Sequence, residues 1–126
     1  MISTCGIDFG TSNSTVGIWK DGAFSMVPVE GAYTTVPSAI FYPAEGTQPL
    51  YGRAGIAAYT AREPGRLMRS LKSILGSSLI DDKTGVGGQY RTFEEILVGF
   101  LGHLKDWLVE PASQEQLTVV GSYNLF

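Results

Sequence analysis

Several features that mark particular classes of protein are missing from this sequence of 126 residues. It contains one cysteine, Cys5, so no disulfide can form within the chain. Cys5 lies in an apolar run and is expected to be a small buried core residue rather than a reactive thiol. There is no stretch of about 18 apolar residues that would predict a membrane-spanning helix. There is also no basic leader followed by an apolar segment, so we expect a cytoplasmic protein without a membrane partner.

The chain also lacks an excess of positive charge. Its formal net charge is −3, and no run of like charges would form a binding tail. These properties argue against a nucleic-acid partner, which requires a basic surface. The hydrophobic content of 44% and charged content of 17% are those of folded proteins, so we expect a chain with a real core.

The first part of the sequence predicts three consecutive strands. Apolar residues dominate residues 2–9, 15–19 and 24–29. A polar turn lies between the first two strands, and Asp21-Gly22 is typical of a tight hairpin between the second and third. We therefore expect an antiparallel meander at the start of the fold.

The middle of the chain predicts a mixed region. Residues 39–42 have the composition of a short strand and residues 52–59 that of a helix. Apolar residues within 66–75 have helical spacing and are followed by Gly76, which predicts a second helix. The polar, glycine-rich segment 81–88 is expected to be a flexible loop.

A helix from Phe93 to about Val109 is the clearest predicted element. Thr92 and Glu95 have the spacing of a capping box at its start. Its apolar residues recur at intervals of three and four, as on one face of a helix: Phe93, Ile96, Leu97, Phe100, Leu101, Leu104 and Leu108. A last strand is predicted at residues 116–120. Strands, a mixed region, a long helix and a returning strand together predict an α/β fold with a mixed sheet.

The segment with the clearest chemical character lies between the first two strands. The first strand ends near a carboxylate, Asp8, and Gly10 follows, where the backbone can approach a ligand closely. Thr11, Ser12 and Asn13 then form a polar turn whose N–H and hydroxyl groups can contact phosphate oxygens. Asp8 can hold a hydrated Mg²⁺ beside them. The alternative is an ordinary hairpin with a polar turn.

Other nucleotide-binding motifs are missing. The chain has no G-x-x-x-x-G-K-[ST] sequence, which excludes a P-loop NTPase on motif grounds. The glycines at 85–88 lack the spacing of a dinucleotide-binding turn. The sole histidine, His103, has no neighbours at metal-ligand spacing and is expected at the edge of an apolar helix face.

Residues 6–15 resemble the first phosphate motif of the superfamily that contains actin, hexokinase-type sugar kinases and DnaK-type seventy-kilodalton heat-shock chaperones. Further segments are similar to the chaperone branch, in the same order along the chain: 17–22, 35–41, 50–54, 71–76, 93–108 and 119–123. Asn13 and Ser73 depart from the family pattern, and Gly121 replaces a family proline. The resemblance is therefore to a divergent bacterial chaperone-like protein.

The resemblance implies a ribonuclease-H-like, actin-type ATPase fold, of which this chain supplies only the first lobe. Residues 1–36 and 93–126 are expected to form its sheet subdomain, and residues 37–92 an inserted subdomain. Asp8 is implied to coordinate Mg²⁺ through water. Gly10, Thr11, Ser12 and Asn13 are implied to face the β- and γ-phosphates of ATP or ADP.

The resemblance also implies a catalytic role for Lys72, which would reach the γ-phosphate and act with Asp8 in hydrolysis. On composition alone, a lysine on a helix is usually a solvated surface residue. The segment around Lys72 that matches the family favours the catalytic role.

Parts of the family pattern have no counterpart in the sequence. These are the second, glycine-rich phosphate motif, the adenosine motif, the second lobe and the peptide-binding domain. We expect an N-terminal fragment of an ATPase that is inactive alone, because phosphoryl transfer needs both sides of a cleft. The implied partners are the missing remainder of the nucleotide-binding domain and, through absent regions, unfolded protein clients and co-chaperones. The fragment is also expected to self-associate.

Three other functions stay open at the level of the sequence. A sugar kinase of the same superfamily would need sugar-contacting residues in the inserted region, where no convincing motif is found. An actin-like filament protein would use ATP to regulate assembly. A pseudo-ATPase would bind the nucleotide without turning it over, although the retention of Asp8 and Lys72 argues against it.

Overall fold

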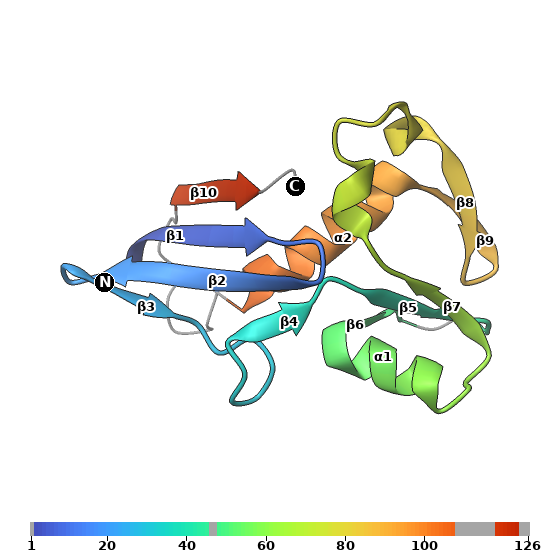
Figure 1. Ribbon diagram of the computed structural model, residues 1–126, viewed down its shortest axis with the longest axis horizontal. Coiled ribbons are helices and arrows are strands. Elements are labelled where there is room, and N and C mark those ends of the chain that lie inside the picture. The colour runs from blue at the N-terminus through green and yellow to red at the C-terminus, as the bar shows by residue number, and fades with distance from the viewer. Residues whose placement is uncertain (1, 46–47, 108–117, 124–126) are drawn as a thin grey trace.

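Alternating apolar and polar residues near the N-terminus build the largest sheet of the molecule. In the computed structural model, which describes residues 2–45, 48–107 and 118–123, the strands β1 (Ile2–Phe9), β2 (Asn13–Lys20) and β3 (Ala23–Met26) form an antiparallel meander (Figure 1). Asp21 and Gly22 join β2 to β3 with φ of 52° and 76°, the left-handed conformation of a two-residue hairpin turn. The predicted meander is confirmed, although the third strand ends at Met26 rather than at residue 29.

Two further strands complete this sheet, whose order is β10-β1-β2-β3. Strand β10 (Thr118–Tyr123) runs parallel to β1, and strand β4 (Thr35–Pro37) pairs with the first residues of β2. The predicted last strand is therefore present within the described residues from Thr118 onward. Its first two predicted positions, 116 and 117, lie outside them. Parallel and antiparallel pairs in one sheet, together with helices, make the fold mixed α/β.

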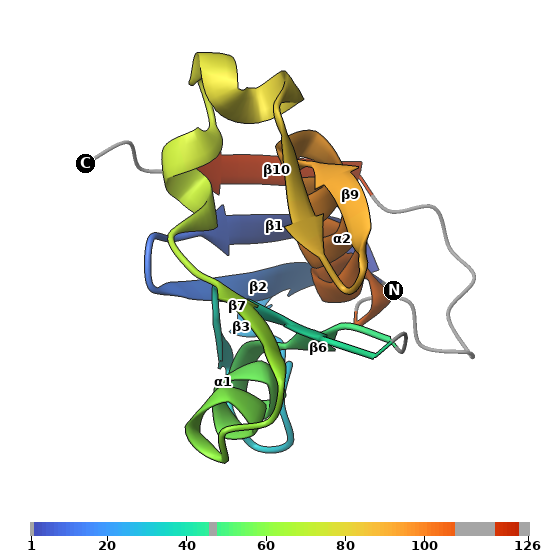
Figure 2. The ribbon, with the colours of Figure 1, turned by 90° about the vertical axis from the view of Figure 1, so that its right-hand side faces the viewer.

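Helix α2 (Phe93–Asp106) covers one face of the large sheet (Figure 2). The Thr92 hydroxyl oxygen accepts the Glu95 amide at 3.1 Å, which confirms the predicted cap at the helix start. The buried side of α2 is formed by Ile96, Leu97, Phe100 and Leu104. The ring of Phe100 lies 5.7 Å from that of Phe9 on β1. Cys5 belongs to the same core and is buried, as expected. The predicted end of the helix, near residue 109, lies outside the described residues.

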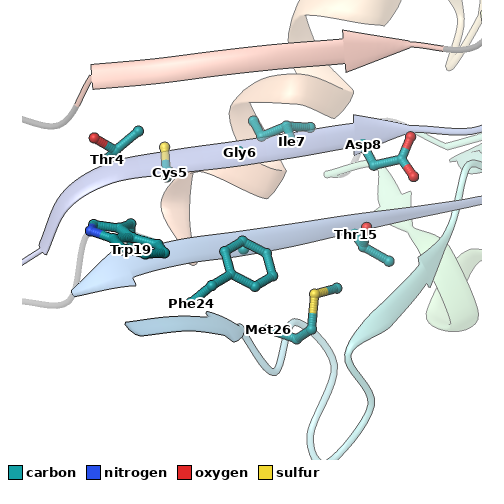
Figure 3. Close-up of a pocket in the computed structure, with 10 residues that line it drawn as sticks. Thr4, Cys5, Gly6, Ile7, Asp8, Thr15, Trp19, Phe24 and Met26 are labelled. Atoms are coloured by element: carbon teal, nitrogen blue, oxygen red, sulfur yellow. The ribbon is translucent and has the colours of Figure 1, made fainter. Parts of the chain in front are cut away.

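The opposite face of the sheet is open (Figure 3). The strand register places Asp8 opposite Thr15, and Trp19 opposite Phe24. These side chains and that of Met26 surround a shallow hollow of about 420 Å³. Trp19, Phe24 and Met26 are exposed, at 47%, 60% and 41%. This face therefore carries apolar surface that no described element covers.

A second, smaller sheet lies beside the first. Its order is β6 (Leu50–Tyr51), β5 (Ile40–Pro43) and β7 (Gly65–Met68), and helix α1 (Gly52–Thr60) packs against it. Gly55 allows the helix to approach closely, because a Cβ there would lie 2.6 Å from the Leu50 carbonyl oxygen. Neither α1 nor α2, the α-helices of the described ranges, is long and apolar enough to cross a membrane.

A salt bridge fastens the start of α1 to the segment before β4. The Arg53 amide donates to Glu30 Oε2 at 2.8 Å, and Arg53 Nη1 lies 2.7 Å from Glu30 Oε1. The guanidinium group also donates to the carbonyl and hydroxyl oxygens of Thr35 and stacks over the ring of Tyr33 at 3.8 Å. The side chain of Arg53 is therefore fully engaged in holding the fold together.

The predicted helix over residues 66–75 is wrong. This segment contains strand β7 and then a short 3-10 helix, η1 (Leu71–Ile74). Strand β7 pairs with β5, a partner about two dozen residues earlier in the chain, and this distant pairing overrides the local pattern. Ser70, between the two elements, has a left-handed backbone with φ of 55°, which prevents a continuous helix.

The predicted flexible loop over residues 81–88 is also wrong in part. After a short 3-10 helix, η2 (Ser78–Asp81), the chain forms a hairpin of β8 (Lys83–Val86) and β9 (Gln89–Thr92). Gly87 and Gly88 make its turn with φ of 59° and 75°, which glycine adopts without steric cost. The glycines thus form a specific hairpin turn.

Candidate functional site

The turn between β1 and β2 is a tight backbone loop that requires glycine at its start. The Gly10 amide donates to the Asn13 carbonyl oxygen at 3.0 Å. A Cβ at Gly10 would lie 2.3 Å from that same oxygen, closer than non-bonded atoms approach. The side chains of Thr11, Ser12 and Asn13 are exposed. The closed loop therefore presents three polar side chains to solvent at the end of β1.

Ser38, just after β4, fastens this turn from behind. Its hydroxyl donates to the Gly10 carbonyl oxygen at 2.9 Å, and its amide donates to the Ser12 carbonyl oxygen at 2.9 Å. The Ser38 and Ser14 hydroxyl oxygens are 2.7 Å apart. A hydroxyl carries one hydrogen, so Ser14 is the donor in that pair. Both serines are buried. The turn is therefore fixed by a buried polar network.

Sequence reasoning noted the segment that contains Ser38 only for its family likeness and gave Ser38 no role. Its partners lie 24 and 28 residues earlier, so no local pattern indicates the contact. The sequence does offer one indication of a structural role, because Ser38 lies between Pro37 and an apolar run that predicts a short strand. A hydroxyl in such a place needs a hydrogen-bond partner.

Asp8 lies near the carboxyl end of β1, and its side chain is exposed. It points to the open face of the sheet, near Thr15 of the neighbouring strand (Figure 3). On its other side β1 pairs with the parallel strand β10, so the carboxyl ends of two parallel strands meet here. This is the edge at which open α/β sheets commonly bind ligands.

Lys72 lies in η1 and is only 5% exposed. Within the described residues its ammonium group forms no ion pair or hydrogen bond. No side-chain nitrogen or oxygen of the described residues is both buried and without a partner, so the ammonium nitrogen reaches solvent while the aliphatic stem is buried. An ammonium at such an edge is available to an anion. Most of the side chain is therefore packed into the fold rather than lying on a solvated helix face.

The turn and the segment before Lys72 meet at a small cavity of about 180 Å³. Thr11 and Ser12 line one side of it, and Arg69 and Ser70 line the other. Of the predicted site residues, the structure thus brings Thr11 and Ser12 to a common cavity. Asp8, Gly10, Asn13 and Lys72 are not among the residues that line it.

No ready-made protein cage for a metal is found among residues 2–45, 48–107 and 118–123. No three His, Cys, Asp or Glu side chains gather there. Mg²⁺ does not need such a cage, since it keeps several waters and binds through one or two carboxylates together with substrate phosphates. The exposed carboxylate of Asp8 beside a polar turn fits this mode of binding.

Sequence comparisons relate the chain to curated chaperones. The chaperone protein HscA homolog of Shewanella oneidensis is 35% identical over 81 residues, which cover 64% of this chain and 12% of that protein. The corresponding protein of Laribacter hongkongensis is 33% identical over 86 residues, which cover 68% of this chain and 14% of that protein. No family model matches the chain.

These similarities, at about 32–35% identity over about two thirds of the chain, make it a divergent relative of the DnaK-type seventy-kilodalton heat-shock chaperones. The matched region spans only 12–14% of the length of these curated relatives. The resemblance seen in the sequence is thereby confirmed at the level of the family.

Proposed function

We propose that this chain is the N-terminal part of an ATP-binding and ATP-hydrolysing domain of a heat-shock-chaperone-like protein. The observation that carries the proposal is the meeting of two distant segments. Ser70, two residues before the buried Lys72, lines the same cavity as Thr11 and Ser12 of the polar turn. Similarity to the HscA homologs supports the chaperone assignment.

In this proposal the chain forms the first lobe of an actin-type ATPase fold. Residues 1–36 and 93–126 are its sheet subdomain, and residues 37–92 are its inserted subdomain. The proposed division is supported by the separate small sheet, since β5, β6 and β7 all lie within 37–92. Strand β4 lies at the boundary and pairs with the large sheet.

The proposed ligand is ATP or ADP with Mg²⁺. Asp8 would hold the metal through water, and the turn from Gly10 to Asn13 would receive the β- and γ-phosphates on its N–H and hydroxyl groups. The ammonium group of Lys72, whose side chain is largely buried, would face the γ-phosphate. The Mg²⁺ ion, when bound, would neutralise charge on the phosphates. The rigid turn would position these groups, because its backbone is fixed by Ser38.

The activity of the whole protein is part of the proposal. Its nucleotide state would control the binding of unfolded protein clients, in cooperation with co-chaperones in the cytoplasm. The chain alone is expected not to hydrolyse ATP, because the residues described supply one side of a cleft and phosphoryl transfer needs both.

The test is a titration of the 126-residue chain with MgATP, followed by the backbone amide signals in NMR spectra. Signals of Thr11, Ser12 and Asn13 are expected to shift. Lys72→Met removes the charge but keeps most of the side-chain volume, and should weaken binding about tenfold or more. Lys83→Met is the matched control, because Lys83 is exposed on β8.

Asp8→Asn is expected to weaken binding in the presence of Mg²⁺ and to change it little without the metal. Binding that is unaffected by both Lys72→Met and Asp8→Asn, in variants with the native spectrum, would contradict the proposed nucleotide site. Measurable ATP turnover by the chain alone would contradict the expectation that one lobe is inactive.

A further inference from the structure

A groove lies between the small sheet and the turn of the β8–β9 hairpin. Its floor is the face of the sheet that carries Tyr42 and Arg66, which are register partners on β5 and β7 and therefore project to the same side. Helix α1 packs on the opposite side, where a Cβ at Gly55 would lie 3.2 Å from that of Phe41. The hairpin turn lies over the floor, since a Cβ at Gly87 would lie 3.8 Å from the Tyr42 ring (Figure 1). The groove has a volume of about 470 Å³, within the 300–1,000 Å³ of binding pockets.

Arg66 supplies hydrogen-bond donors to this groove from a fixed position. Its Nη1 donates to the Gly85 carbonyl oxygen at 2.9 Å and to the Thr84 hydroxyl oxygen, which hold the guanidinium group against the hairpin. The Nε and Nη2 groups have no partner within the described residues. The Gln89 side chain also lines the groove, and its oxygen accepts from Arg91 at 3.4 Å. Its NH₂ group is thereby left as a further donor.

The charge at the groove is positive. Arg66 is the only charged residue among the described residues that line it. Glu45 and Glu63 lie within two residues of the lining segments but do not line the groove themselves. The guanidinium group of Arg53, by contrast, is paired with Glu30. A guanidinium group with free N–H groups and no acidic partner is complementary to a carboxylate, which it binds through charge-assisted hydrogen bonds.

The exposed ring of Tyr90 forms one side of the groove. Tyr90 is 82% exposed on β9, beside its register partner Gly85, where a Cβ would lie 3.8 Å from the ring. A Cβ at Gly88 would meet nothing within 4 Å, so the backbone of the turn is accessible as well. A small-molecule site buries about 70–90% of its ligand, which a groove this open does not. An exposed tyrosine next to a fixed arginine is instead typical of the sites where proteins bind one another.

We propose that this groove docks an extended segment of a partner protein in which an acidic and an apolar side chain lie close together. Arg66 and the Gln89 amide bind the carboxylate, and the ring of Tyr90 packs against the apolar side chain. Gly88 lets the segment approach the hairpin turn closely. The inference stands apart from the proposed nucleotide site, because this groove and the cavity at the polar turn share no lining residue.

The experiment selects peptides from a random heptapeptide library, displayed on phage, against the immobilised 126-residue chain. The enriched peptides are expected to contain aspartate or glutamate near a large apolar residue, and to shift the NMR amide signals of Gly85, Gly87 and Gly88. In calorimetry with a synthetic copy of such a peptide, Arg66→Gln should weaken binding about tenfold or more. Arg69→Gln is the matched control, because Arg69 is a nearby arginine that does not line this groove, and it should change the affinity by less than about twofold.

Tyr90→Ala provides a second test, because Arg66 also holds the hairpin and its loss can disturb the fold. Tyr90 is largely exposed, so its truncation should leave the fold intact and weaken peptide binding about tenfold. The peptide supplies the complementary change. Replacing its acidic residue by the corresponding amide should weaken binding to the wild-type chain as much as Arg66→Gln does, and should have little effect on binding to the Arg66→Gln variant.

Four results would overturn the proposal. The selection could yield no peptide that binds above an uncoated surface, or peptides without an acidic residue. Arg69→Gln could weaken binding as much as Arg66→Gln. Peptides whose binding is lost in Phe24→Ser but kept in Tyr90→Ala would assign the docking surface to the open face of the large sheet. None of these results bears on the proposed nucleotide site, which the titration with MgATP tests separately.

Discussion

Replacement of Ser38 by alanine tests whether the buried network holds the polar turn. The Ser38 hydroxyl donates to the Gly10 carbonyl and accepts from the Ser14 hydroxyl. Ser38→Ala therefore leaves one carbonyl and one hydroxyl without their partners. Ser14 is fully buried, so water cannot replace the lost acceptor.

The expected cost follows from these two losses. A buried donor or acceptor left without a partner costs about 1–3 kcal/mol. The bond to Gly10 is only partly buried, so its loss lies at the lower end of that range. The free energy of unfolding should fall by about 2–4 kcal/mol in total, a large part of the 5–15 kcal/mol of a typical domain.

A second substitution, Ser14→Ala, tests the network through the sign of its effect on stability rather than through the size of that effect. In the wild-type chain, Ser14→Ala removes a donor from Ser38 and should lower the free energy of unfolding by about 1 kcal/mol. In the Ser38→Ala background, Ser14→Ala removes a hydroxyl that has already lost its partner. There it should raise the free energy of unfolding by about the same amount. The sign of the effect therefore reverses.

The assay is urea unfolding of the four chains, followed by far-ultraviolet circular dichroism. Ser73→Ala serves as a control, because the Ser73 hydroxyl bonds only to the Ser70 carbonyl at the surface and should change stability by less than about 0.5 kcal/mol. Equal costs of Ser14→Ala in both backgrounds would refute the reasoning, since the two hydroxyls would then act independently.

Two further predictions concern Gly10 and His103. Gly10→Ala should destabilise the chain by about 1–3 kcal/mol and abolish triphosphate binding, because the added Cβ would meet the Asn13 carbonyl oxygen. Gly102→Ala is the control: it lies in open space on α2 and should stabilise the chain by up to about 1 kcal/mol. Urea unfolding and calorimetry measure both, and unchanged binding in Gly10→Ala would contradict the prediction. The ring of His103 stacks on that of Tyr51 at 4.3 Å. Burial lowers the pKa of His103 below its usual 6.5, and the negative charges of Asp106 and Glu30 partly oppose this effect. The unfolded chain therefore takes up this proton first as the pH falls below 6.5, so stability is full above 6.5 and is lost as the pH falls through the folded pKa. His103→Gln should flatten the stability profile below pH 6.5, and a profile as steep as that of the wild type would show that His103 is not responsible.

The elements that sequence reasoning located correctly are those whose pattern is local. Helix α2 is predicted by the Thr92 cap and by apolar residues that recur every three to four positions. The hairpin at Asp21-Gly22 is similarly encoded by two adjacent residues. In both cases the residues that decide the structure are close together in the sequence.

Strand β7 was misread because its structure depends on a distant partner. Leu67, Met68 and Leu71 have a spacing that fits a helix, but Leu67 and Met68 pair with Phe41 and Ile40 of β5. The left-handed backbone of Ser70 is likewise not encoded by its residue type. Local propensity cannot anticipate such contacts.

The candidate site could be anticipated only in part for the same reason. The polar turn from Gly10 to Asn13 is contiguous in the sequence, so its residues could be named in advance. Ser38 and Arg69 reach that turn from 24 or more residues away, and only the folded chain places them there. The family resemblance supplied Lys72, whose burial the sequence did not indicate.

The open face of the large sheet also determines how the protein responds to temperature. Trp19 and Phe24 are already 47% and 60% exposed in the folded state, so unfolding newly exposes only about half of their surface. Newly exposed apolar surface is the main source of the heat-capacity increase on unfolding, which is normally about 12–15 cal/mol/K per residue. Trp19 and Phe24 therefore add less to this increase than two enclosed rings would. To that extent the stability curve is flatter, and cooling weakens the fold less than it would if both rings were buried.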